Sequence, residues 1–88
     1  MKISEGFILR KVGKDQVVMA IGKASVKLNG MIRLNDSGTL LWNLLKEGAE
    51  EEQLVQALKK EYEISDEQAA NDAQAFLSIL RSVGCIEE

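Results

Sequence analysis

The pattern of apolar residues changes at Asn35. Before this residue, short runs rich in β-branched residues alternate with polar ones, which is typical of strands that bury one face. After it, leucines and alanines recur every three or four residues, which is typical of helices with one buried face. The order predicts an α+β fold, in which a small antiparallel sheet packs against a bundle of helices.

Two β-hairpins are predicted before Asn35. Phe7–Val12 and Gln16–Ile21 flank a Gly-Lys-Asp sequence, which favours a tight turn. Ser25–Leu28 and Met31–Leu34 flank an Asn-Gly pair. This pair suits a two-residue type I′ turn, because both of its central residues need a positive φ.

Three helices are predicted after the strands. Their expected ranges are about Asp36 to Lys46, about Glu50 to Tyr62, and Ser65 to Val83. Ser65 begins an S-x-x-Q sequence, the pattern of a capping box, which marks the start of the last helix.

Several large or sulfur-containing side chains are expected in one core. Trp42 lies beside the leucine stripe of the first helix, and Tyr62 is expected to seal the same core from the end of the second. The only cysteine, Cys85, cannot form an internal disulfide and is expected to be a buried apolar residue. With 88 residues and no linker-like stretch, residues 1–88 are expected to form one domain.

Composition argues against several classes of function. The chain has no histidine, so it lacks the commonest general base and metal ligand. Its glycines are scattered singly and its acids lie on faces expected to be solvated, so no enzyme activity, catalytic residue, metal or cofactor is predicted. A net charge of −3 and a pI near 5.0 disfavour nucleic acid as a partner. Without a membrane-length apolar run or a secretory signal, the expected location is the cytoplasm.

The centre of the chain resembles a known family. The run from Gly30 to Gly38, followed by Trp42 and Leu45, is similar to the L-N-x-x-G-x-x-x-W centre of PqqD-like proteins. The chain departs from the family at Ala49, where a Ser or Thr cap is usual, and at Ala73, where a larger aliphatic residue is typical. Further matches to the C-terminal pattern of the family are Leu54, Leu58, Tyr62, Asp72, Phe76, Leu77, Leu80 and Gly84.

The resemblance covers essentially the whole chain and implies a fold and a function. The fold is winged helix-turn-helix-like, with N-terminal antiparallel β-hairpins followed by three α-helices. Proteins of this family are recognition elements for ribosomally made peptides that are modified after translation. The implied role is that of a peptide chaperone, which binds the leader of a precursor peptide and presents it to a modifying enzyme, often a radical S-adenosylmethionine (radical SAM) protein. In the namesake system that peptide becomes the cofactor pyrroloquinoline quinone.

The resemblance also implies where the leader binds. In the family the leader adds as a strand beside the last strand and lies against the last helix. An edge strand suits this role, because its unpaired backbone groups bind with little demand on sequence. Ile79 lies off the buried stripe of the last helix, which fits either a groove residue or a lone surface aliphatic. Carried over to this chain, the edge is Met31, Ile32, Arg33 and Leu34, and the groove is lined by Asp72, Phe76 and Ile79.

Other interpretations stay open at this point. Arg33 either pairs with an acidic leader residue or keeps the edge soluble, and Phe76 is expected to be shared between core and groove. A winged-helix DNA-binding regulator would have the same order of elements, but the last helix offers only Arg81 to a phosphate backbone. The chain is expected to be a monomer or a homodimer, because a free edge strand can also pair with its own copy.

Overall fold

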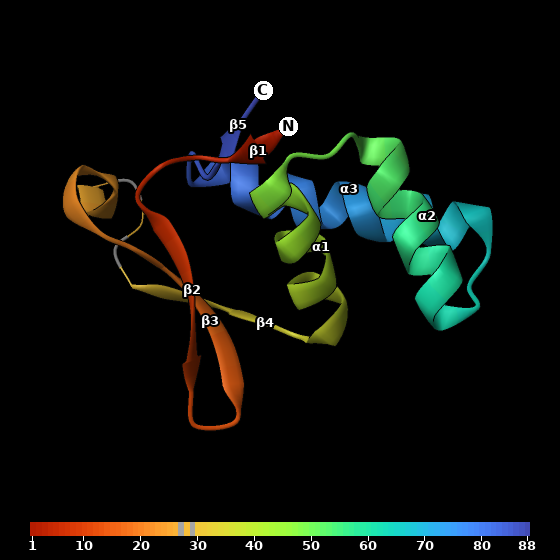
Figure 1. Cartoon of the computed structure of the whole chain (residues 1–88), viewed down its shortest axis with the longest axis horizontal. Coiled ribbons are helices and arrows are strands. Elements are labelled where there is room, and N and C mark those ends of the chain that lie inside the picture. Colours follow the sequence, from red (N-terminus) through yellow and green to blue (C-terminus); the bar gives the residue numbers. More distant parts are fainter. Residues whose placement is uncertain (27, 29) are drawn as a thin grey trace.

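The strands come first and the helices follow, as the sequence predicts (Figure 1). The computed structural model describes residues 1–26, 28 and 30–88. The elements in chain order are β1 (Lys2–Ile3), β2 (Phe7–Val12), β3 (Asp15–Ala20), the 3-10 helix η1 (Gly22–Val26), β4 (Met31–Leu34), α1 (Asp36–Glu47), α2 (Glu51–Tyr62), α3 (Asp66–Ser82) and β5 (Ile86–Glu87).

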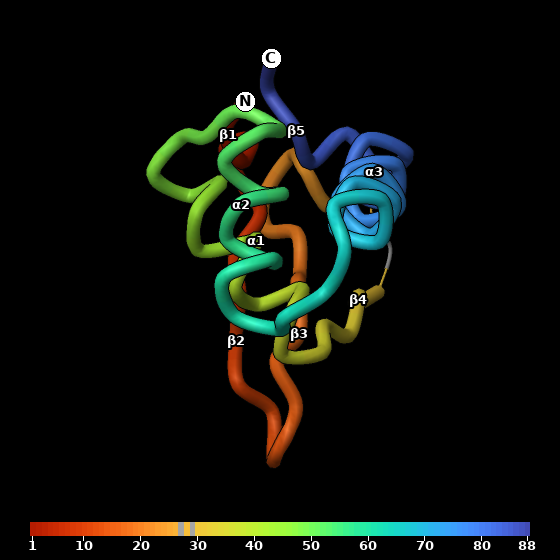
Figure 2. The backbone as a smooth tube through the Cα atoms, turned by 90° about the vertical axis from the view of Figure 1, so that its right-hand side faces the viewer, coloured from red at the N-terminus to blue at the C-terminus, as the bar shows by residue number. Residues whose placement is uncertain are grey.

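The main sheet has three antiparallel strands in the order β2-β3-β4. The first predicted hairpin is confirmed, because β2 and β3 pair along their whole length, from Phe7 opposite Ala20 to Val12 opposite Asp15. β4 pairs with the other side of β3, with Leu34 opposite Gln16. β4 is therefore an edge strand, and its free side faces α3 (Figure 2).

The second predicted hairpin is wrong. Ser25 and Val26 end the 3-10 helix η1 and form no strand, and β4 pairs with β3 instead. Lys27 and Asn29 of that prediction lie outside the described residues. Packing explains the difference, since buried Ala24 lies so close to Gly6 that a Cβ on Gly6 would come within 2.8 Å of the Ala24 Cβ. This tertiary contact outweighs the local preference of an Asn-Gly pair.

A second, two-stranded sheet was not predicted. β1 pairs with β5, so that Lys2 lies opposite Glu87 and Ile3 opposite Ile86. The N–H of Ser4 also donates to the carbonyl of Cys85 over 2.7 Å. These bonds bring the two ends of the chain side by side, at the end of the molecule away from the β2-β3 turn (Figure 1).

Each helix begins at a residue where side chain–backbone hydrogen bonds satisfy N–H groups that have no partner within the helix. Asn35 caps α1, because its side-chain oxygen accepts from the N–H of Gly38 over 2.8 Å. Ser65 caps α3 as predicted, accepting from the N–H of Gln68 over 3.1 Å. The N-cap of α2 is Glu50, one residue after buried Ala49, and the Glu50 N–H donates to Oε1 of Gln53 over 2.7 Å.

The core lies between one face of the three-stranded sheet and the three helices. Trp42 and Cys85 are buried there as predicted, and burial raises the pKa of the Cys85 thiol to about 12. The prediction for Tyr62 is wrong, because 40% of this residue is exposed. Among the described residues, no helix has both the length and the apolar character needed to cross a membrane.

Candidate functional site

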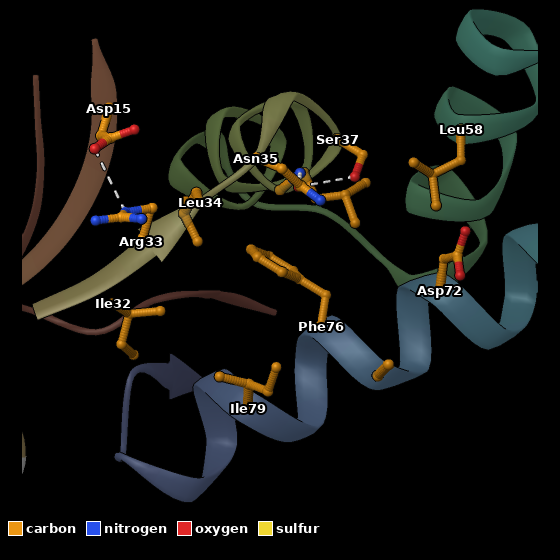
Figure 3. A pocket seen from close by; sticks show the side chains of 13 residues that line it. Asp15, Ile32, Arg33, Leu34, Asn35, Ser37, Leu58, Asp72, Phe76 and Ile79 are labelled. Carbon is orange, nitrogen blue, oxygen red and sulfur yellow. Dashed lines mark hydrogen bonds and ion pairs between the residues drawn. The ribbon is translucent and has the colours of Figure 1, made fainter.

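A groove of about 620 Å³ runs between β4 and α3 (Figure 3). It is open to solvent along the unpaired edge of β4, and residues at the start of α1 also line it. The structure thus brings together two segments that are far apart in sequence. Six of the residues named from the resemblance line it: Ile32, Arg33, Leu34, Asp72, Phe76 and Ile79.

Met31 is the one named residue that does not line the groove. Met31 is 58% exposed, whereas Ile32 packs partly against the core. Met31 can therefore contribute its backbone to the edge but does not shape the groove with its side chain.

Arg33 forms an ion pair across the sheet. Its Nε lies 3.4 Å from Oδ2 of Asp15, which begins β3 (Figure 3). Both side chains are largely exposed, so the pair contributes little to stability. Within this chain, Asp15 is thus a partner for Arg33 that the sequence pattern did not single out.

α3 presents a different set of side chains to the groove than to the core. Phe76 is partly buried, packs against the core and points across the groove toward Leu34, which confirms that it is shared between the two (Figure 3). Ile79 is 51% exposed and lies one turn further along, beside Ile32. These three side chains, Phe76, Ile79 and Ile32, form an apolar floor that opens to solvent.

Gly38 makes the close approach of α1 to α3 possible. A Cβ at this position would lie 3.3 Å from Cε1 of Phe76 and 3.2 Å from Oδ1 of Asn35. Because glycine has no Cβ, the first turn of α1 can rest against the Phe76 ring while Asn35 keeps its cap bond. This gives the Leu-Asn-x-x-Gly sequence a physical reason, although the sequence pattern alone assigned no role to Gly38.

The groove also has polar groups, among them the carboxylates of Asp15 and Asp72. Asp72 lies at its far end, next to Leu58 of α2, and its Oδ1 accepts from Nε2 of Gln68 over 2.8 Å (Figure 3). Asn35 and Ser37 also line the groove, and the Ser37 hydroxyl donates to Oδ1 of Asn35. In the described part of the chain, no three His, Cys, Asp or Glu side chains are gathered as a metal site would require.

Two solved structures resemble the whole chain. One is described as TbiB1 in complex with the TbiA(beta) leader peptide: it has a TM-score of 0.79 and 25% sequence identity, and the match covers 99% of this chain and 95% of that one. The other is lasso peptide synthetase B1 complexed with the leader peptide, with a TM-score of 0.78 and 21% identity, covering 99% of this chain and 96% of that one. At this identity the second shows the fold alone.

Two further comparisons use the sequence. Among curated proteins, none matches the chain. The model of the family described as coenzyme PQQ synthesis protein D matches residues 15–86, which include β3, β4 and all three helices. The chain therefore belongs to the PqqD family.

Proposed function

We propose that this protein binds the leader segment of a ribosomally made precursor peptide in the groove between β4 and α3. The observation that carries the proposal is the groove itself, because it joins an unpaired strand edge to an apolar floor. Membership of the PqqD family supports it. So does the similarity to TbiB1, which was solved with a leader peptide.

The leader binds as a fourth strand beside β4. The free N–H and C=O groups of the edge pair with the peptide backbone, which provides affinity for many sequences. Alternate side chains of the added strand then point toward α3, where Ile32, Phe76 and Ile79 receive them. Burying two aliphatic or aromatic side chains contributes roughly 1.5–3 kcal/mol each, so the leader should carry two apolar residues separated by one.

Binding serves a modification reaction that another protein performs. In this proposal residues 1–88 act as one recognition domain and carry out no chemistry. The domain holds the precursor and presents it to the modifying enzyme, for which a radical SAM protein is our first candidate. The proposed place of action is the cytoplasm, where ribosomes release the precursor.

The DNA-binding alternative finds little support. α3 carries one basic residue, Arg81, and its guanidinium lies 2.9 Å from a carboxylate oxygen of Glu88. With a net charge of −3, the chain has few groups to neutralise a phosphate backbone. The helix beside the groove also presents Asp72, which would repel phosphate.

Calorimetric titration tests the proposal. The purified protein is titrated with the leader of the precursor encoded nearest to its own gene, with the same peptide in scrambled order, and with duplex DNA at the same salt concentration. We expect a dissociation constant in the micromolar range or below for the leader and much weaker binding of the other two. Failure to bind the leader, together with salt-sensitive binding of the DNA, would establish the regulator instead.

A further inference from the structure

A second pocket, of about 390 Å³, continues the groove beyond the end of β4. It lies where the start of α1, the end of α2 and the first half of α3 meet. Tyr62, Ile64 and Asp36 belong to this pocket alone. The residues that line both cavities are Asn35, Ser37, Leu58 and Asp72. A peptide that leaves the edge of β4 at Leu34 therefore enters this pocket directly.

One part of the second pocket is lined by two aliphatic side chains and one aromatic side chain, Leu58, Ile64 and Tyr62. Leu58 is almost fully buried and forms its base, and Ile64 is half-buried beside it. Tyr62 ends α2, after which Glu63 takes a left-handed conformation with a φ of 48°. The chain turns back at that residue, so the Tyr62 ring stays at the surface and lines the pocket, although the sequence predicted that it would seal the core.

The charged groups of the pocket are all negative. Asp36 and Asp72 both line it, and no Lys or Arg of the described residues does. Lys59, one of the two basic residues in the last turn of α2, forms an ion pair with Asp66. Of these two carboxylates, Oδ1 of Asp72 accepts a hydrogen bond from Gln68, and the other oxygens accept none from the described residues.

We propose that this pocket binds a lysine or arginine side chain of the same peptide that occupies the groove. The inference rests on the proposed function and deepens it by adding a charge requirement. The aliphatic stem of such a residue packs on Leu58 and Ile64, and its cationic end lies against the exposed Tyr62 ring. The two carboxylates accept its N–H groups. A neutral aromatic residue would fill the volume but would give the two carboxylates no cationic partner.

The position of the basic residue follows from strand geometry. The two cavities share Asn35, the residue that follows β4, so the pocket begins where the added strand ends. A strand rises about 3.3 Å per residue. The basic residue should therefore lie about one to three positions outside the part of the peptide that pairs with β4, on the side next to Leu34.

Selection from a display library of random dodecapeptides tests the inference, since it needs no known leader. The immobilised full chain selects binders, and amide shifts map the enriched peptides onto the protein. We expect sequences with two alternating apolar residues and one basic residue at a fixed distance from them. One enriched peptide and its Lys→Met or Arg→Met form are then titrated into the wild type, the double variant D36N/D72N and the matched control E61Q. Glu61 is exposed on α2 and lines neither cavity.

The wild type should bind the basic peptide about tenfold more tightly than its Met form, and added salt should reduce this preference. The preference should disappear in D36N/D72N and remain in E61Q, with melting curves showing that both variants fold. Enriched peptides that shift β4 amides but show no basic preference, or an equal preference in D36N/D72N, would overturn the inference and leave the proposed function intact. If no peptide is enriched, or none shifts the β4 amides, the proposed function itself fails.

Discussion

The two faces of α3 belong to one helix but meet different surroundings. One face is fully buried against the sheet and the other helices, and the other borders the open groove beside β4. The buried face consists of Ala69, Ala73, Leu77 and Leu80. The groove face consists of Asp72, Phe76 and Ile79. Stability should therefore depend on the first set and peptide binding on the second, with Phe76 contributing to both.

This comparison shows how a small domain can keep an exposed apolar site without losing its core. The small residues Ala69 and Ala73 on the buried face let α3 lie close to its neighbours. The larger Phe76 and Ile79 lie beside this contact rather than in it, so they remain available to a ligand. Three substitutions and one measurement of thiol reactivity test whether the two faces are as separate as the structure indicates, from the largest expected effect to the smallest.

Leu77→Ala should have the largest effect on stability. Leu77 is 0% exposed, and removing a fully buried leucine side chain costs about 3–4 kcal/mol, because apolar contacts are lost and a cavity remains. The free energy of unfolding in urea measures this change. Peptide affinity of the fraction that stays folded should be nearly unchanged. A loss below about 1 kcal/mol would mean that the buried face can collapse around the gap.

The Cys85 thiol reports on the end of the same buried face. The backbone N–H of Cys85 donates to the carbonyl of Leu80. Burial raises the pKa of the thiol to about 12 from an ordinary value of 9.0. At pH 8 we expect alkylation in the native protein to be about a thousandfold slower than in denaturant, since the thiolate is the reactive form. As pH rises from 9.0 toward 12, unfolding should become easier, because the unfolded chain loses this proton first. Equal alkylation rates with and without denaturant would show that this end of the core is open.

Ile79→Glu tests the groove face. A carboxylate here would lose its hydration when the peptide binds, so leader affinity should fall about thirtyfold, or about 2 kcal/mol. Val12→Glu is the matched control, because Val12 is 48% exposed and Ile79 51%, yet Val12 ends β2 at the other edge of the sheet. Both variants should stay within about 0.5 kcal/mol of wild-type stability. Equal losses of affinity in the two would mean that the peptide does not distinguish the edges.

Gly38→Ala should lower leader affinity less than Ile79→Glu does and leave stability nearly unchanged. The added methyl group would press on the Phe76 ring and the Asn35 side chain, and the half-buried ring can give way only toward the groove. We expect leader affinity to fall about fivefold while stability changes by less than about 1 kcal/mol, because the helix gains from alanine what it loses in packing. Calorimetry and urea unfolding measure the two quantities. Unchanged affinity would indicate that the Phe76 ring is not part of the binding surface.

Much of the fold could be predicted from local signals. Asn35 and Ser65 mark helix starts through side-chain bonds to residues three positions away, and the spacing of leucines defines the buried faces. The β2-β3 hairpin is also local. The pairing of β4 with β3 and of β1 with β5 could not be predicted in this way, because strand partners distant in sequence are chosen by packing of the whole chain.

The candidate site shows the same division. The family resemblance named six residues that line the groove, including Phe76 and Ile79. It did not explain Gly38, whose importance depends on a ring from another helix, or Tyr62, whose position depends on the turn at Glu63. Both are consequences of how α1, α2 and α3 meet, which no short stretch of sequence describes.

Amide hydrogen exchange with and without the leader tests strand addition most directly. β2 and β4 are the two edges of one sheet, so each serves as the control for the other. Leader binding should slow exchange of the free amides of Met31–Leu34 and leave Phe7–Val12 unchanged, because only β4 gains a hydrogen-bonded neighbour. Leader binding that leaves β4 exchange unchanged, or that slows both edges equally, would contradict the central claim that the peptide joins the sheet beside β4.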